Sequence, residues 1–213
     1  MNLIEKAVEL AVRAHAGQVD EDGMPHIIHC FEVFRRVQEM FDGMSYDLRP
    51  TLAKYTQEEV LIAAILHDTV EDTSVTLDQI EQEFGKNVRD IVDSVSRRST
   101  KGEYNHAPET KEFYRDFIYR AQGNEGGLIV KIADLSHNLS RAPKIKKASW
   151  RNKLEFKYRI ALIVLNDVCQ PSWEEASYSV QHDGTVAHYF VADPNGKKIE
   201  ISEEEFKSLK SKA

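Results

Sequence analysis

The chain has 213 residues, of which 28 are lysine or arginine and 35 are aspartate or glutamate, so its formal net charge is −7. This length is enough to bury a hydrophobic core without disulfides or structural metals. With 41% hydrophobic and 30% charged residues, the composition is that of a globular protein and not of a disordered chain. The acidic balance disfavours general binding to DNA or RNA, which requires a positive surface.

The apolar segments are short. The longest uninterrupted runs, Val60–Leu66 and Ile160–Leu165, are far shorter than the roughly 20 residues that span a bilayer, so no membrane contact is expected. The first residues lack the basic and apolar regions of a secretory signal. Cys30 and Cys169 lie in apolar helical patterns, which is typical of reduced thiols. These features predict a cytoplasmic protein.

Apolar residues recur at helical spacing through most of the chain. The third predicted helix, after a capping box at Thr56, is apolar nearly all round and is expected at the centre of the fold. Two short helices are expected to meet at Gly85. The predicted helices cover, in chain order, residues 3–17, 27–43, 56–67, 76–85, 88–95, 108–123, 128–142 and 149–169.

Beyond Pro171 the period changes to alternation, which predicts a β-hairpin around Asp183-Gly184, a short strand at Lys198–Ile201 and a short helix from Ser202. The sequence therefore predicts a mainly α fold with a helical domain over residues 1–170 and a small hairpin extension over residues 171–213. The apolar face of the hairpin is too small to be stable alone. It is expected to pack on its own helical body or on a second copy, which leaves a homo-oligomer open.

Four ionisable residues crowd the end of the most hydrophobic helix: His67, Asp68, Glu71 and Asp72. On a helix, His67 and Glu71 project from nearly the same face, and so do Asp68 and Asp72. Like charges so close together are costly unless a cation lies among them. The alternative is an exposed acidic helix end with one capped histidine.

A second group, Asp134, His137 and Asn138, shares one face of an apolar segment, and His29 lies at the start of the second predicted helix. An aspartate after so many aliphatic residues is expected to be buried and to need a partner or a metal; the alternative is an aspartate that caps the next turn. A lone histidine at position 29 would more often be a core residue.

Two imidazoles and two carboxylates in this order would form a mixed nitrogen and oxygen site, from His29, His67, Asp68 and Asp134. Such a donor set suits Mn²⁺, Fe²⁺ or a comparable divalent ion better than a thiolate site does. Four protein ligands leave octahedral positions open for water and substrate, which indicates a catalytic site.

At this point the sequence resembles the HD superfamily of metal-dependent phosphohydrolases, and within it the hydrolase domain of RelA/SpoT proteins and the Mesh1-like small alarmone hydrolases. The resemblance covers about residues 1–170. Four ordered blocks carry it: Ala-His-Ala-Gly-Gln at 14–18, Gly-Met-Pro-His-Ile-Ile-His at 23–29, Ala-Ala-Ile-Leu-His-Asp-Thr-Val-Glu-Asp-Thr at 63–73 and Val-Lys-Ile-Ala-Asp-Leu-Ser-His-Asn-Leu at 130–139.

The resemblance implies an HD-domain helical bundle in which the four donors hold Mn²⁺. It further implies that Glu71 and Asp72 orient and activate the attacking water, that Asn138 binds substrate and that Tyr158 contacts the nucleoside. An ordinary tyrosine on a long helix is the alternative for Tyr158. The implied reaction is removal of the 3′-pyrophosphate of guanosine 3′,5′-bis(diphosphate), the alarmone ppGpp of the stringent response.

The chain also departs from the family pattern. Where the family reads Tyr-Ile-x-His-Pro, this chain has His26-Ile27-Ile28-His29-Cys30, and the preceding loop carries Asp20, Glu21 and Asp22 where the family has arginine or lysine. Three acids beside a polyphosphate pocket should weaken recognition of ppGpp. Basic residues that could compensate are Arg97, Arg98, Lys101, Lys144, Lys146 and Lys147, although any one of them is more often solvated surface charge.

Two alternatives for the function stay open. The same site could act on another nucleotide, such as a nucleoside monophosphate, a dNTP or NADPH, and the acidic loop supports this. The chain could also be a non-catalytic nucleotide-binding module, but a binder has no need of the Glu71 and Asp72 pair. His15, His106, His182 and His188 have no spacing that assigns them as ligands.

Overall fold

The structure is a computed structural model that describes residues 2–20, 23–43, 52, 54–100, 110–166, 176–180, 187–192 and 198–201. The chain forms two compact units, Met1–Tyr158 and Arg159–Ala213, and each is treated by itself. The prediction of a mainly helical protein is confirmed.

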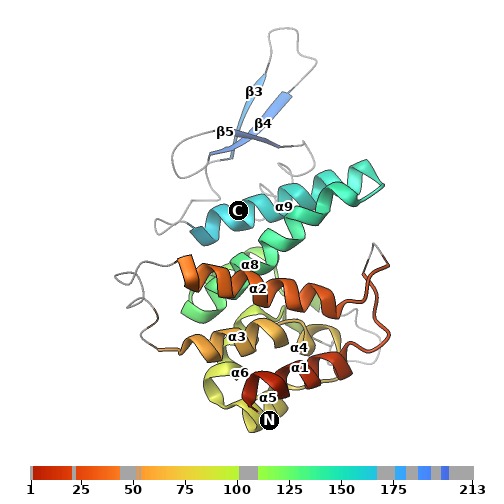
Figure 1. The fold of residues 1–213 in the computed structure, drawn as a ribbon. Coiled ribbons are helices and arrows are strands. Elements are labelled where there is room, and N and C mark those ends of the chain that lie inside the picture. Colours follow the sequence, from red (N-terminus) through yellow and green to blue (C-terminus); the bar gives the residue numbers. More distant parts are fainter. Residues whose placement is uncertain are drawn as a thin grey trace. The chain divides into compact units, whose positions relative to one another are not determined.

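The described residues of the first unit form helices (Figure 1) and one short strand pair. Its elements are α1 (Leu3–Ala14), α2 (Ile27–Gly43), α3 (Gln57–Leu66), α4 (Thr69–Asp72), α5 (Leu77–Phe84), α6 (Lys86–Val95), β1 (Ser99–Thr100), β2 (Thr110–Lys111), α7 (Tyr114–Gln122), α8 (Glu125–Arg141), the 3₁₀ turn η2 (Ala142–Lys144) and the first part of α9 (Ala148–Asn166).

Helix α3 lies at the centre of this unit, as its uniform hydrophobicity predicts. All seven residues of Val60–Leu66 are 5% exposed or less. Helices α1, α2, α6 and α8 pack against α3 (Figure 1). The helix begins with the predicted capping box, in which Thr56 and Glu59 each accept a backbone N–H from the other. A rigid buried helix therefore leads directly into the His67-Asp68 pair.

The predicted helix start at Pro108 is wrong. Thr110–Lys111 is an extended strand paired with Ser99–Thr100, and α7 begins only at Tyr114. Bonds between distant residues hold this backbone extended, because Glu112 donates its N–H to Arg98 O at 2.8 Å and its carbonyl accepts from the Arg97 guanidinium. These tertiary bonds override the local helix signal.

A smaller correction concerns the helix that carries the His-Asp pair. Helix α3 ends at Leu66, His67 and Asp68 form a turn, and the one-turn helix α4 follows. The backbone stays close to helical through this turn, since Asp72 donates its N–H to Asp68 O at 2.9 Å. The predicted end of the last helix at Cys169, the Asp183-Gly184 turn and the helix from Ser202 lie outside the described residues.

The second unit contains the rest of α9 and a three-stranded antiparallel sheet in the order β3-β4-β5. Its strands are β3 (Ala176–Val180), β4 (Ala187–Ala192) and β5 (Lys198–Ile201), with Tyr178 opposite Tyr189 and Val191 opposite Ile199. The expected division after residue 170 and the packing of the extension stay predictions.

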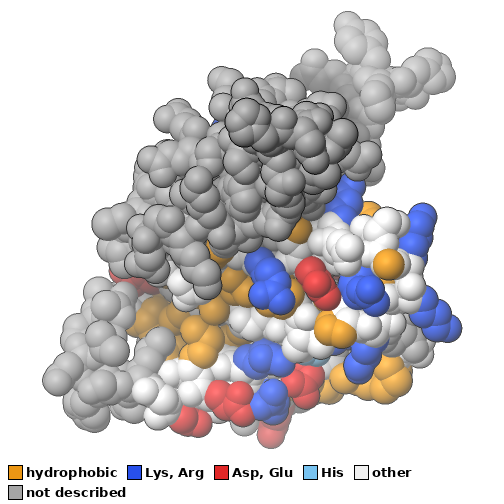
Figure 2. Space-filling model, turned by 90° about the horizontal axis from the view of Figure 1, so that it is seen from above, with side chains coloured by type: hydrophobic (Ala, Val, Ile, Leu, Met, Phe, Trp, Pro, Cys, Tyr) orange, Lys and Arg blue, Asp and Glu red, His pale blue; other side chains and the backbone are white. Residues whose placement is uncertain are grey.

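Two properties of the described part bear on partners. Among its helices, none is both long enough and apolar enough to cross a membrane. On the face seen in Figure 2, basic side chains lie among acidic and hydrophobic ones and do not form a continuous stripe.

Candidate metal centre and substrate pocket

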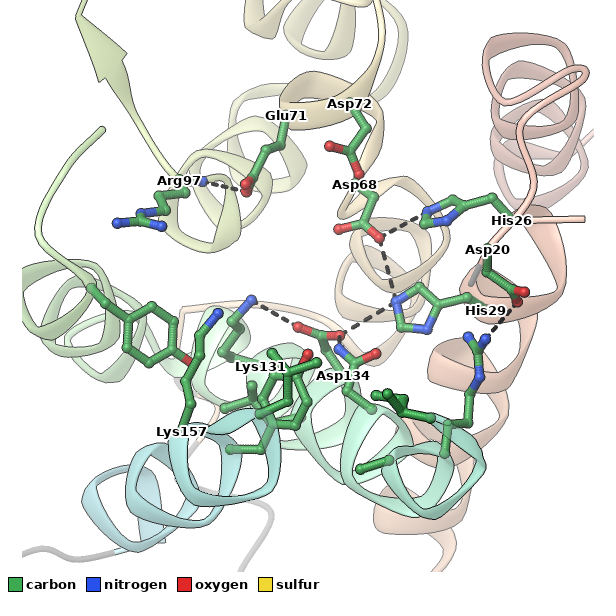
Figure 3. A pocket seen from close by; sticks show the side chains of 18 of the residues that line it. Asp20, His26, His29, Asp68, Glu71, Asp72, Arg97, Lys131, Asp134 and Lys157 are labelled. Atoms are coloured by element: carbon green, nitrogen blue, oxygen red, sulfur yellow. Dashed lines mark hydrogen bonds and ion pairs between the residues drawn. The ribbon is translucent and has the colours of Figure 1, made fainter. Parts of the chain in front are cut away.

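A pocket of about 410 Å³ opens between α2, the α3–α4 turn, α8 and the middle of α9 (Figure 3). This volume is within the range of small-molecule sites. The structure brings the predicted site residues together here. Those that line the pocket are His29, Asp68, Glu71, Asp72, Asp134, Asn138 and Tyr158, while His67 is fully buried next to them.

The orientation of His67 follows from its place at the end of α3. Its Nδ1 donates to Ala64 O at 3.0 Å, one helical turn earlier, so Nε2 points away from the helix. Nε2 then lies 3.1 Å from Asp68 Oδ2 and 3.1 Å from His29 Nε2. A backbone carbonyl thus fixes which nitrogen is free to bind an ion.

Asp134 completes this group from α8. It lies in the middle of the helix and is 4% exposed, so the alternative of a turn-capping aspartate is wrong. Its Oδ1 lies 3.3 Å from His29 Nε2 and 4.0 Å from His67 Nε2, and His29 Nε2 lies 3.3 Å from Asp68 Oδ2. His29, His67, Asp68 and Asp134 are called the four-donor cluster below.

These separations fit a single ion. Donors bound at about 2.1 Å are about 3.0 Å apart at right angles, about 3.4 Å apart at tetrahedral angles and about 4.2 Å apart on opposite sides. The observed separations of 3.1–4.0 Å fall within this range. Donor atoms of His29, His67 and Asp68 lie close enough together to hold a divalent metal ion, and Asp134 Oδ1 lies 3.3 Å from His29 Nε2 to join them. These nitrogen and oxygen donors suit a borderline ion.

The charges of the cluster also require a cation. Burial raises the pKa of Asp134, but Lys131 and the neighbouring histidines outweigh burial and hold that pKa well below its usual value. Burial lowers the pKa of His29, but contacts with Asp134 and Asp68 outweigh it and raise the pKa to about 10. The buried Asp134 and the partly exposed Asp68 thus retain either a proton on His29 or a metal ion in its place.

His137 supports the cluster and was not assigned from the sequence. Its Nδ1 lies 2.7 Å from His29 Nδ1. Burial and the neighbouring His29 lower the pKa of His137 to about 4, so the ring is neutral and accepts the Nδ1–H of His29. His29 Nε2 is therefore directed at the carboxylates. The shared helix face with Asp134 and Asn138 was the available sequence signal.

Two further side chains of α8 hold Asp134. Lys131 Nζ donates to Oδ2 at 2.7 Å, and Asn138 Nδ2 donates to Oδ1 at 2.5 Å. Lys131 is 7% exposed and was missed, although its spacing of three from Asp134 is that of a helical ion pair. Asn138 also lines the pocket, so its amide links the cluster to the place where substrate would lie.

Glu71 and Asp72 face the pocket from α4 (Figure 3). Glu71 Oε2 accepts the backbone N–H of Arg97 at 2.8 Å, which orients the carboxylate. Burial raises the pKa of Glu71, and burial together with the charge of Asp68 raises that of Asp72. Carboxylates with raised pKa values are better proton acceptors, as a general base requires.

Arg97, Lys131 and Lys157 bring positive charge to the side of the pocket away from His26 (Figure 3). Lys157 Nζ lies 4.3 Å from the centre of the Tyr114 ring, and Tyr114 also lines the pocket. Burial, together with Lys131 and Arg97, lowers the pKa of Lys157 to about 8. Lys157 was missed because only the fold turns this position of α9 to the pocket.

Of the basic residues expected to compensate for the acidic loop, only Arg97 lines the pocket among those that are described. Arg98 pairs with Asp93 at 2.9 Å, and Lys101 lies outside the described residues. Lys144, Lys146 and Lys147 are exposed and do not line the pocket.

The acidic loop enters the pocket at Asp20, which forms an ion pair with Arg141 at 2.7 Å (Figure 3). Glu21 and Asp22 lie outside the described residues. The negative charge of Asp20 is thus compensated, and the Arg141 guanidinium is held in this ion pair.

Comparison with known proteins adds a family and several relatives. The HD domain family model matches residues 7–120. A guanosine-3′,5′-bis(diphosphate) 3′-pyrophosphohydrolase of Aquifex aeolicus is 30% identical over 158 residues, which is 74% of this chain and 19% of that protein. A probable GTP pyrophosphokinase of Mycobacterium leprae is 32% identical over 141 residues, 65% of this chain and 16% of the relative.

The bifunctional (p)ppGpp synthase/hydrolase SpoT of Escherichia coli is 31% identical over 136 residues, 64% of this chain and 17% of that protein. This chain therefore spans less than a fifth of the length of these relatives. One solved structure, a metazoan ortholog of SpoT described as hydrolyzing ppGpp, gives a TM-score of 0.57 at 23% identity and covers 78% of this chain and 85% of that chain. At this identity the likeness shows the fold.

Proposed function

This chain belongs to the HD domain family, and from that membership we propose that it is a metal-dependent nucleotide phosphohydrolase. The favoured reaction is removal of the 3′-pyrophosphate of ppGpp. The observation that carries the proposal is the four-donor cluster on the pocket wall, with Glu71 and Asp72 beside it, Lys131 bound to Asp134, and Arg97 and Lys157 also lining the pocket. That arrangement matches a phosphate-bearing substrate with a hydrolysable bond.

In this proposal His29, His67, Asp68 and Asp134 hold Mn²⁺. When bound, such an ion polarises a phosphoryl oxygen and lowers the pKa of a water molecule. Glu71, with Asp72 beside it, orients the attacking water and takes up its proton. The fixed position of the Glu71 carboxylate on the Arg97 N–H and its raised pKa both suit this role.

The substrate is a small-molecule nucleotide in this account. Arg97 and Lys157 neutralise its phosphates, Asn138 positions the group next to the cluster, and Tyr158 contacts the nucleoside. Their places on the pocket wall support these roles. Lys131 is held in an ion pair with Asp134 at 2.7 Å, so in this account it adds positive charge to the pocket from a fixed position.

The names of the relatives leave the direction of the chemistry to be tested, since they include both pyrophosphokinases and pyrophosphohydrolases. The part of this chain that the HD domain family model matches contains the His-Asp pair and Glu71. A carboxylate base beside the four-donor cluster favours hydrolysis by water.

A second candidate keeps the site and changes the substrate to a nucleoside monophosphate, a dNTP or NADPH. One observation favours it: Asp20 forms an ion pair with Arg141, whose guanidinium could otherwise bind a second diphosphate of the substrate. Residence in the cytoplasm, the absence of general nucleic-acid binding and a catalytic role confined to residues 1–170 remain predictions.

Phosphate and pyrophosphate release from a panel of nucleotides, with Mn²⁺ present, separates these readings. The proposal expects pyrophosphate from ppGpp at a rate well above that of every other nucleotide. Faster release from a monophosphate, a dNTP or NADPH would favour the second candidate. Binding of a nucleotide with no release from any of them would contradict a hydrolase.

A further inference from the structure

A second cluster of metal-binding side chains adjoins the pocket through His26, which also lines it. It consists of His15, just after α1, His26, just before α2, and Cys30 in the first turns of α2. One donor atom of each residue lies within 4.8 Å of the other two. None of the three belongs to the four-donor cluster.

The hydrogen bonds around His15 leave one ring nitrogen unused. Gln18 Nε2 donates to Asp72 O at 2.9 Å, which fixes the amide and makes Gln18 Oε1 the acceptor of His15 Nδ1–H at 2.8 Å. His15 Nε2 therefore carries a lone pair. It has no hydrogen-bond partner among the residues that the structure describes, and His15 is only 3% exposed. A buried acceptor without a partner is costly and calls for an occupant.

His26 has the complementary arrangement. Its Nε2 lies 3.0 Å from Asp68 Oδ2, and because a carboxylate can only accept, Nε2 carries a proton; in the neutral ring this leaves the lone pair on Nδ1. The His15 and His26 rings are 4.7 Å apart between centroids. Cys30 is fully buried, and its Sγ is the third donor of the group.

The backbone holds these donors in place. His26 donates its N–H to Gln18 O at 3.0 Å, Gln18 donates its N–H to His15 O at 3.0 Å, and Val19 pairs with Pro25 across the loop. Two hydrogen-bonded links thus tie the end of α1 to the start of α2. The histidines are therefore presented from a closed loop whose ends are fixed.

We propose that His15, His26 and Cys30 bind a second divalent ion of the zinc type, separate from the ion of the four-donor cluster. Binding forms bonds to His15 Nε2, His26 Nδ1 and Cys30 Sγ and releases the thiol proton to solvent. Two imidazoles and one thiolate are a donor set that selects zinc over Mn²⁺ or Mg²⁺. A water molecule takes the fourth tetrahedral position.

The ion has a direct connection to the catalytic pocket. An ion on His26 Nδ1 orients the ring whose Nε2–H donates to Asp68, a proposed ligand of the first ion. His26 and Cys30 are also the positions where the sequence replaces the Tyr and Pro of the family pattern. The second site thus uses two positions at which this chain departs from that pattern, and it stands independently of the proposed reaction.

Cobalt tests the proposal, because a thiolate bound to Co²⁺ gives an intense near-ultraviolet charge-transfer band and the four-donor cluster contains no thiolate. The full-length protein, first saturated with Mn²⁺, is titrated with Co²⁺. The band should appear, saturate at one equivalent per chain and disappear on addition of Zn²⁺. The chain has two cysteines, which supplies a matched pair of variants. Cys169→Ser should keep the band and Cys30→Ser should lose it.

Absence of the band in the wild-type protein, or its persistence in Cys30→Ser, would overturn the proposal. Circular dichroism and an unchanged Mn²⁺ content show that Cys30→Ser is folded. If that variant does not fold, zinc-edge X-ray absorption of the wild-type protein decides, because one sulfur neighbour is required and a spectrum with none refutes the site. Nucleotide hydrolysis is assayed separately, so failure of either proposal leaves the other intact.

Discussion

Glu71 is the side chain whose replacement separates catalysis from metal binding. It faces the pocket from α4 and is not one of the four donors. Glu71→Gln keeps the size of the side chain and its bond from the Arg97 N–H but removes the basic carboxylate. Turnover should fall on the order of 10²-fold or more, while Mn²⁺ content and substrate affinity stay unchanged.

The matched control is Glu83→Gln, an exposed residue of α5 that should leave all three quantities unchanged. Single-turnover kinetics with metal analysis give the result. A wild-type rate for Glu71→Gln would transfer the role of base to Asp72.

Lys157 should give the substrate affinity a pH dependence. Its pKa is lowered to about 8, so its positive charge is present below that pH and is lost above it. If the charge binds substrate phosphate, kcat/KM falls as the pH rises through about 8. Lys157→Arg should abolish this fall, because a guanidinium stays protonated throughout.

Lys157→Met should lower kcat/KM already at pH 7, mainly through KM. Lys153→Arg, an exposed lysine on the same helix, is the control and should keep the wild-type profile. The assignment fails if the alkaline fall is identical in Lys157→Arg.

At this scale the sequence predicts some contacts and not others. Asp68 and Asp72, or Asp134 and Asn138, are four apart on helical segments, so their shared direction follows from helix geometry. The contacts of His26 with Asp68 and of His29 with His137 join residues 42 and 108 positions apart. No local periodicity encodes such distances along the chain, so the supporting histidines emerge only from the fold.

Among the elements, the crossing of α8 and α6 positions Asp134. A Cβ on Gly127 would lie 2.0 Å from Ser94 Oγ, which is bound to Ile91 O. Gly127→Ala should therefore destabilise the protein by about 1–3 kcal/mol, the usual cost of overpacking, although alanine is the better helix former. The affinity for Mn²⁺ should fall with it, because α8 carries Asp134.

Gly123→Ala is the comparison, since its Cβ would make only ordinary contacts at 3.5 Å and beyond. It should be neutral or slightly stabilising in urea denaturation. Equal stabilities of the two alanine variants would mean that α6 and α8 do not need this close approach.

The elements themselves were largely predictable where hydrophobic periodicity and capping agree. Helix α3 has both signals, and its position at the centre follows from its sequence. The start of α7 was mispredicted because Pro108-Glu109 resembles a first helical turn, whereas bonds from Arg97 to Glu112 set the backbone. A local helix signal does not determine the backbone conformation where residues distant in the sequence form hydrogen bonds with the same backbone N–H and C=O groups.

For the whole molecule, the extension after Pro171 should not be needed for metal binding. All four donors precede it, and they lie in the unit Met1–Tyr158. A truncation that ends at Pro171 should remain folded and bind Mn²⁺ with wild-type stoichiometry, while its thermal stability, association state or substrate preference changes.

Metal analysis and analytical ultracentrifugation of the truncated chain test this. A soluble, folded truncation that binds no Mn²⁺ would show that the extension contributes to the site and that the proposed division at residue 170 is misplaced. Unchanged stability, association and substrate preference would leave the extension without a role in this chain.

The central claim is that one divalent ion lies among His29, His67, Asp68 and Asp134, and anomalous diffraction from crystals soaked in Mn²⁺ tests it most directly. Data recorded on both sides of the manganese edge should give one strong difference peak about 2.1 Å from His29 Nε2, His67 Nε2 and one oxygen of each aspartate. A peak at other residues, or no peak in fully soaked crystals, would contradict the account.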